Sequence, residues 1–150
     1  YRKVGLRYAT NGMAEWTKGR GDVTATRAEV YCASRHEASW VPSMLDALAR
    51  YPAQQQADLA PLDTIPVGRA LDGSRSPYRA ILLGTPEPLD GVEAGAIDGL
   101  YREPILLHRI IGIHDQELEY AHRRGAAALW GRLLETGDDL LIDGSRPSAV

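Results

Sequence analysis

Histidine and carboxylate side chains near position 115 are the residues of this chain best suited to chemistry. His114, Glu117 and His122 lie close together in sequence, and His108 precedes them in an apolar run. Imidazole and carboxylate groups bind zinc, but the His-Glu-x-x-His spacing that would place two ligands and a base on one helical face is absent. We therefore expect no metal site, and we interpret His108 as a hydrogen-bonded histidine of a buried strand.

The sequence also gives little support to nucleophilic catalysis or nucleotide binding. Cys32, the one cysteine, lies in an alternating apolar pattern without an evident base, and we interpret it as a buried structural thiol. The Gly-x-Ser-x-Gly motif is missing, as are both glycine-rich phosphate-binding motifs. Asp138 and Asp139 are neighbours, but they lack the apolar pocket that separates the pKa values of a hydrolase pair. We assign no catalytic residue and no cofactor, and an enzymatic role is the less favoured one.

The charge distribution argues against nucleic acid as a partner. The chain has 17 Lys and Arg, 20 Asp and Glu, and a pI of about 5.8. Seven basic and three acidic residues fall in positions 1–35, with only scattered aromatic residues among them. Nucleic-acid-binding domains instead present a basic stripe and a high pI. No apolar run approaches the ~18 residues that cross a bilayer, so we expect no membrane partner either.

Length and composition predict one globular domain. The 150 residues are 44% hydrophobic and 25% charged, and a chain of this size buries about 70% of its unfolded surface. We expect a single domain over residues 1–150, with residues 144–150 as a terminal tail or linker. The lone cysteine and the absence of a signal segment at the start favour a reducing, cytoplasmic location.

Residues 84–100 form an acidic, glycine-rich stretch. It holds four Gly, two Pro and no basic residue, and its acids are Glu87, Asp90, Glu93 and Asp98. Loops longer than about 12 to 15 residues in compact domains are often functional or disordered. The stretch is therefore a candidate partner-binding surface, and a solvated connection is the alternative.

An apolar run at residues 105–113 is expected to organise the other elements. Aliphatic side chains occupy both alternating sets of positions, which is typical of a central strand buried on both faces, and Ile111 should be nearly inaccessible. The polar residues that follow, from His114 to Glu117, predict the capped first turn of a helix. Arg109 is unusual in such a strand and needs a carboxylate partner, for which Glu29 and Glu117 are the candidates.

Periodicity and turn residues predict the remaining elements. Strands are expected at residues 3–9 and 27–33, which can pair as a wide hairpin, and at 78–83 and 138–143. Residues 59–69 predict a short edge strand or an ordered loop. Helices are expected at residues 40–51, 115–123 and 126–136. Pro42 belongs in the first turn of the first helix, and Pro52 should end or bend it, after which residues 54–58 can add another helical turn.

Several loose motifs in a fixed order resemble the suppressor of fused (SUFU) domain family. They are Val4-Gly5-Leu6, Arg27-x-Glu29, Trp40 followed by Leu45-x-x-Leu48-Ala-x-Tyr51-Pro52, Asp63-Thr64-Ile65-Pro66-x-Gly68, the 78–83 strand, Ile110-Ile-Gly-Ile leading into Glu117-Leu118, and Gly125-x-x-x-Leu129. The resemblance implies an α/β (α+β) domain, with a mixed, largely antiparallel sheet flanked by helices. It implies no catalytic residue.

The resemblance also implies a protein-binding role. The animal member of the family restrains a transcription factor by embracing an extended peptide that adds a strand, and bacterial members look like immunity proteins of polymorphic toxin systems. We therefore expect a non-catalytic protein that neutralises a cognate toxin. The alternatives are a regulatory module that binds a peptide by strand addition, with the Val67 segment as the exposed edge, and an unrecognised enzyme or small-ligand domain.

Overall fold

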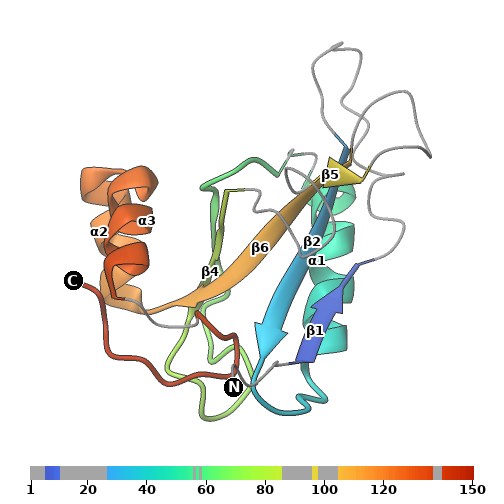
Figure 1. The fold of residues 1–150 in the computed structure, drawn as a ribbon, viewed down its shortest axis with the longest axis horizontal. Coiled ribbons are helices and arrows are strands. Elements are labelled where there is room, and N and C mark those ends of the chain that lie inside the picture. The colour runs from blue at the N-terminus through green and yellow to red at the C-terminus, as the bar shows by residue number, and fades with distance from the viewer. Residues whose placement is uncertain are drawn as a thin grey trace.

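The computed structural model describes residues 6–10, 27–55, 57, 59–85, 96–97, 105–136 and 140–150 (Figure 1). The strands in this part of the chain are β1 (Leu6–Ala9), β2 (Arg27–Ser34), β3 (Thr64–Pro66), β4 (Ala80–Leu83), β5 (Ala96–Ile97) and β6 (Ile105–Ile113). The helices are α1 (Val41–Gln55), α2 (Asp115–Arg124) and α3 (Ala126–Glu135).

Strand β6 is the centre of the sheet and has different neighbours along its length. Its first half runs parallel to β2, from Arg27 opposite Ile105 to Tyr31 opposite Arg109. Its second half runs antiparallel to β4, and β5 pairs antiparallel with its beginning. β1 and β3 complete the order β1-β2-β6-β4-β3, both through antiparallel pairs. The expected mixed, largely antiparallel sheet flanked by helices is confirmed.

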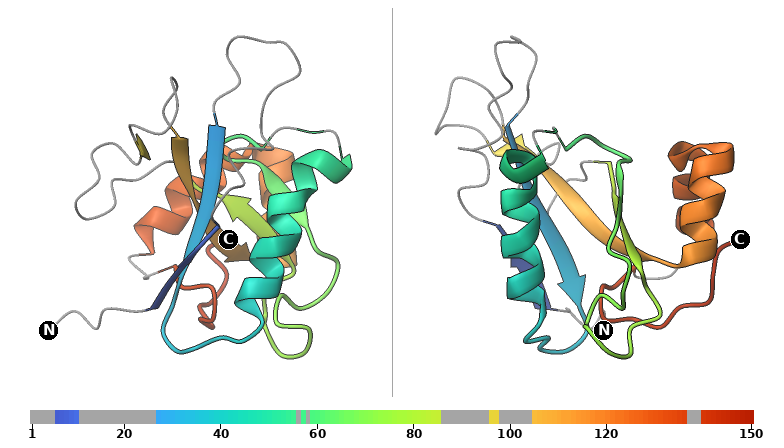
Figure 2. Two further views of the ribbon diagram at one scale, coloured as in Figure 1. Left: turned by 90° about the vertical axis from the view of Figure 1, so that its right-hand side faces the viewer. Right: turned by 180° about the vertical axis from the view of Figure 1, so that it is seen from behind.

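The sheet separates two hydrophobic clusters, one on each face. Helix α1 packs on the first, which contains Val30, Ile81 and Ile110, and helices α2 and α3 pack on the second, which contains Leu82 and Ile111. Figures 1 and 2 show α1 and the α2–α3 pair on opposite sides of the strands. Successive strand side chains point to opposite faces, so a strand with aliphatic residues in both alternating sets of positions supplies both clusters. The expected burial on both faces is confirmed.

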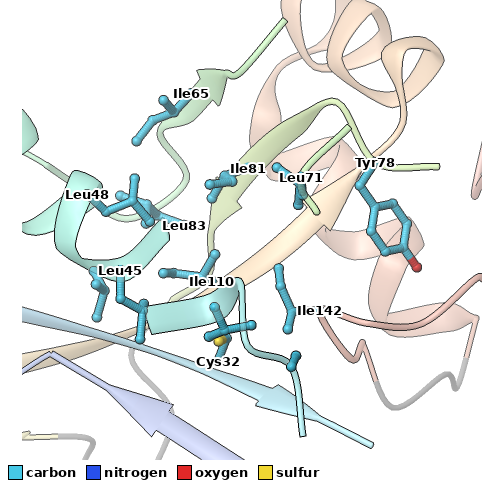
Figure 3. Close-up of a cluster of buried hydrophobic side chains, with 13 residues drawn as sticks. Cys32, Leu45, Leu48, Ile65, Leu71, Tyr78, Ile81, Leu83, Ile110 and Ile142 are labelled. Atoms are coloured by element: carbon cyan, nitrogen blue, oxygen red, sulfur yellow. The ribbon is translucent and has the colours of Figure 1, made fainter. Parts of the chain in front are cut away.

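Residues 140–150, here called the C-terminal strap, contain no helix or strand but close both clusters. Leu140 lies in the α2–α3 cluster and Ile142 in the α1 cluster, close to Cys32 (Figure 3). The N–H of Ile142 donates to Ala33 O at 2.8 Å, and a turn at residues 142–143 then leads the chain away from β2. The predicted strand at residues 138–143 is therefore wrong for its described part, residues 140–143.

Predicted and observed element boundaries agree closely. The central strand has the expected bounds, and the strands 27–33 and 78–83 correspond to β2 and β4. β3 is a short edge strand, one of the two alternatives for residues 59–69. The predicted hairpin of the first two strands is also confirmed. Helix α1 continues through Pro52 to Gln55, beyond the point where it was expected to end or bend, and the Pro52 ring is buried.

Replacing Ile111 with Ala should lower the free energy of unfolding by about 2 to 5 kcal/mol, because truncating a buried aliphatic side chain loses its transfer free energy and leaves a cavity. Ile111 is 1% exposed, and the loss is a large share of a typical total of about 5 to 15 kcal/mol. Urea melts measure the change. Leu134→Ala is the control, because Leu134 is 52% exposed on α3. A loss below about 1 kcal/mol for Ile111→Ala would contradict its interior position.

Candidate functional site

The acidic residues predicted to bind a partner lie outside the described residues. Glu87, Asp90, Glu93 and Asp98 all fall in the undescribed ranges 86–95 and 98–104. Within the stretch 84–100, the described residues 96–97 form β5. The partner-binding surface at these four acids remains a prediction.

The β3 edge, considered above for strand addition, is poorly suited to it. Val67 N–H donates to Arg79 O at 2.9 Å, and Asp63 O accepts from Leu83 N–H at 2.9 Å, so residues at alternate positions direct their backbone groups toward β4. Thr64 and Pro66 therefore direct theirs toward the outer edge. Pro66 has no N–H to donate, and Thr64 alone supplies one. An added strand would find few hydrogen-bond partners here.

An open groove of about 430 Å³ lies between β1 and α1, but its described lining offers little chemistry. It is lined by Tyr8, Ala9, Thr10, Pro42, Leu45, Asp46 and Ala49. The charged side chain among these residues is Asp46, which forms a surface ion pair with Arg50 at 2.9 Å. The hydroxyl of Tyr8 accepts a hydrogen bond from Ala38 N–H at 3.0 Å. The groove thus lacks a paired acid and base.

The side chains of His114 and Glu117, first considered as metal ligands, form the start of a buried hydrogen-bond network. Glu117 Oε2 accepts from the N–H of His114 at 2.9 Å, which caps the beginning of α2. His114 Nε2 donates to Arg146 O at 3.0 Å, while His122 is exposed on α2. Over the described residues, no three His, Cys, Asp or Glu side chains are grouped to hold a metal ion.

Arg146 completes this network, which we call the Glu117–Arg146 clasp. Its Nη1 and Nη2 donate to Glu117 Oε1 and Oε2 at 2.5 and 2.7 Å, the bidentate geometry that suits a guanidinium and a carboxylate. Nη2 also donates to Gly112 O at 3.1 Å, and Ala149 N–H donates to Glu117 Oε1 at 2.8 Å. Glu117 is 0% exposed and Arg146 is 9% exposed. The clasp joins the end of β6, the start of α2 and the C-terminal strap.

Tyr78 forms one wall of the clasp. Its hydroxyl accepts from Arg146 N–H at 3.2 Å, and its ring centroid lies 5.5 Å from the Arg146 guanidinium carbon. The ring of His114 meets Tyr78 edge to face at 5.1 Å. Gly112 permits this packing, since a Cβ there would lie only 2.4 Å from Tyr78 Cδ2. A side chain at position 112 would displace Tyr78.

The electrostatics of Glu117 follow from these contacts. Burial of the carboxylate raises its pKa, but the hydrogen bonds described above, led by those from Arg146, outweigh burial and hold the pKa below its ordinary value of 4.5. Glu117 is therefore charged at neutral pH. A buried charge of this kind is tolerated only where it is paired and hydrogen-bonded.

Cys32, His108 and Arg109 lie among side chains and backbone groups of the folded core and its neighbouring strap. Cys32 is 0% exposed, and burial raises the pKa of its thiol to about 12, so the expected buried structural thiol is confirmed. His108 is 1% exposed and its Nδ1 donates to Gly84 O at 3.4 Å; burial lowers its pKa. The expected core histidine is confirmed. Arg109 Nη2 donates to Leu140 O at 3.4 Å, whereas Glu117, one of its two expected partners, is held by Arg146.

The burial of Arg146 was not predicted from the sequence. It lies in the segment 144–150, expected to be a tail or linker, and a single arginine there has no periodic pattern around it. The one available signal was its partner, because an acid three residues after His114 suits a helix cap. That signal identifies Glu117 but not the cation that reaches it.

Comparison with known proteins gives a consistent result. A family model described as suppressor of fused protein (SUFU) matches residues 5–147. No curated protein sequence matches the chain significantly. No helix in the described ranges has the length and apolar character needed to cross a membrane.

Solved structures share the fold. The chain is 21% identical to one in the crystal structure of the Sufu–Fu complex, with a TM-score of 0.75, covering 95% of this chain and 69% of that one. Drosophila Suppressor of Fused is 24% identical to this chain, with a TM-score of 0.67, covering 83% of this chain and 32% of that one. A SUFU homolog from Neisseria gonorrhoeae FA 1090 is 18% identical, with a TM-score of 0.70, covering 96% of this chain and 70% of that one. At these identities the likeness establishes the fold alone.

Glu117→Gln should lower the free energy of unfolding by about 3 to 5 kcal/mol, because it leaves the Arg146 charge buried without its counter-charge. Arg146→Met should be comparably destabilising. The double variant should be less destabilised than the sum of the singles, since partners in direct contact couple by about 0.5 to 3 kcal/mol. Urea melts of the wild type, the two single variants and the double variant give the free energies of this double-mutant cycle. Additive losses would contradict a coupled clasp.

Acid should remove the contribution of the clasp. The folded-state pKa of Glu117 lies below its ordinary value of 4.5, so the stabilisation is complete above the unfolded pKa and is lost as pH falls through the folded one. The stability difference between the wild type and Glu117→Gln should be constant above about pH 6 and should shrink below about pH 4.5. Urea melts between pH 7 and pH 3 test this. If the stability difference instead grows on acidification, the folded-state pKa of Glu117 is not lowered and the prediction is wrong.

Proposed function

Because the chain belongs to the suppressor of fused family, we propose that it is a non-catalytic protein-binding domain, and that it acts as an immunity protein that neutralises a cognate toxin. The toxin would be made by the same bacterial cell, and neutralisation would take place in the cytoplasm. One relative of this fold was crystallised in a complex, the Sufu–Fu complex. Another is a bacterial homolog of which this chain covers 70%.

The proposal that the domain is non-catalytic is supported by one observation: the potentially reactive side chains of Glu117, Cys32 and His108 are buried or held by hydrogen bonds within the fold. Glu117 is fully engaged by Arg146 and two backbone N–H groups. Cys32 and His108 are buried, and the pKa shift of each favours its neutral form. A nucleophile or general base needs access to substrate and a suitable pKa. Within the described part of the chain, these side chains support the fold instead.

Strand addition is the less favoured mode of partner binding at β3. Pro66 removes a backbone donor from the outer edge, as described above. Recognition through side chains is therefore better supported than strand addition at the β3 edge. The acidic stretch 84–100 fits this mode, because many toxins that act on nucleic acid have basic sites, and complementary charge raises association rates and sets specificity.

Neutralising Glu87, Asp90, Glu93 and Asp98 to Gln or Asn should slow association with the product of the neighbouring toxin gene. Steering by these charges should also be lost, so the association rate should depend less on salt. Biolayer interferometry at two salt concentrations measures both effects.

The control neutralises two Asp and two Glu elsewhere: Asp46, Asp115, Glu119 and Glu135, all exposed. Equal slowing in both variants would show a net-charge effect and would contradict a role for the acidic stretch. Failure of the wild type to bind the product of any neighbouring gene would contradict the immunity function.

A further inference from the structure

The connection between β3 and β4, residues 67–79, carries three exposed arginines. They are Arg69, Arg75 and Arg79, and we call them together the arginine hairpin. The connection lies at the end of the sheet opposite β5 (Figures 1 and 2). It is the same connection whose neighbouring strand, β3, is poorly suited to strand addition.

Backbone hydrogen bonds hold this connection in one conformation. Val67 N–H and Gly68 N–H both donate to Arg79 O, at 2.9 and 3.3 Å, and Leu71 N–H donates to Tyr78 O at 3.1 Å. Tyr78 itself is 1% exposed and belongs to the core. The two arms of the hairpin are therefore fixed to each other and to the domain.

The tip of the connection is equally ordered. Asp72 Oδ1 accepts from the N–H groups of Ser74, Arg75 and Ser76 at 2.8, 2.8 and 2.9 Å. Gly73 has φ 80°, a conformation that glycine adopts without strain. A preorganised backbone reduces the entropy lost when a partner binds. The arginines thus extend from a rigid support.

Carboxylates at this end of the molecule are already used by backbone donors. Asp72 accepts the three N–H groups just described, and these hydrogen bonds lower its pKa. Asp143 accepts from Arg35 N–H and His36 N–H at 2.8 and 3.0 Å. On the neighbouring β2–α1 connection, Arg35 and Glu37 are both exposed and offset each other. Asp72 keeps its charge, but the three arginines outnumber it, so the connection 67–79 carries net positive charge.

Three arginines elsewhere on the described surface have a partner of opposite charge or an aromatic ring beside them: Arg50, Arg123 and Arg132. Arg50 pairs with Asp46 at 2.9 Å and Arg123 with Glu119 at 3.4 Å. Arg132 lies over the ring of Tyr120, 5.3 Å from its centroid. By contrast, no carboxylate among the described residues forms an ion pair with a guanidinium group of the arginine hairpin.

We propose that the arginine hairpin is a docking surface for an acidic segment of the partner protein. The inference rests on the proposed protein-binding function, to which it adds a surface and the charge of the complementary segment. Guanidinium groups form bidentate hydrogen bonds with carboxylates, which gives geometric specificity as well as charge attraction. A pI of about 5.8 disfavours nucleic acid as the ligand, because nucleic-acid-binding domains are strongly basic.

Poly-L-glutamate is the probe for this surface, with duplex DNA and anionic phosphatidylserine vesicles as competing ligand classes. Fluorescence anisotropy at low salt should show binding of labelled poly-L-glutamate, weakened by added salt. The hairpin variant Arg69→Gln/Arg75→Gln/Arg79→Gln should bind about tenfold or more weakly. All three side chains are exposed, so this variant should keep its fold and its urea midpoint.

A matched variant removes three other exposed arginines: Arg50→Gln/Arg123→Gln/Arg124→Gln. It changes the net charge equally and should weaken binding by no more than about twofold. Equal weakening by both variants would overturn the proposal, as would the absence of poly-L-glutamate binding. Tighter binding of DNA or vesicles than of poly-L-glutamate would also overturn it.

The same two variants separate this inference from the immunity function. If the wild type binds the neighbouring toxin and the hairpin variant binds it with unchanged kinetics, the docking surface is wrong and the immunity function stands. If the wild type binds no neighbouring toxin but discriminates the two variants toward poly-L-glutamate, the immunity function is wrong and the acidic-ligand surface stands.

Discussion

Strand β6 is paired at both edges and covered on both faces, and the rest of the fold depends on that constraint. Its edges pair with β2, β4 and β5, while Ile110 and Ile111 contribute to clusters under different helices. A shift of one residue would move each of these side chains to the opposite face. The register of β6 therefore determines where α1 packs and where the α2–α3 pair packs.

The Glu117–Arg146 clasp pairs two buried charges at the end of the same strand. Two buried charges are costly to desolvate, and they stabilise a fold only where the remaining donors and acceptors are satisfied. Here the Glu117 carboxylate accepts from Arg146, His114 and Ala149, and Arg146 also reaches Gly112 O. The geometry keeps the C-terminal strap against the domain, and Leu140 and Ile142 of that strap close the two clusters.

These structural uses of ionisable groups bear on the proposed function. Cys32 and His108 lie in the core, and His114 and Glu117 lie in the clasp, whereas His122 is exposed on α2. The groove between β1 and α1 has no paired acid and base among its described lining residues. These observations support the proposed recognition of a partner through surface charge. The acidic stretch and the arginine hairpin carry opposite signs, so a partner that used both would present a basic and an acidic region.

Features that depend on a local residue pattern could be predicted from the sequence. Aliphatic residues in both alternating sets of positions predicted β6, and helical period predicted α1 to α3. Around Pro66 the sequence left two alternatives, an edge strand or an ordered loop. Side-chain period and backbone restriction act over a few residues, which is why they can be recognised in the sequence. The contact of Arg146 with Glu117 and the place of Ile142 in the α1 cluster are seen only in the folded chain. Such contacts join positions far apart in the chain, and their energy depends on a three-dimensional geometry that no local pattern records.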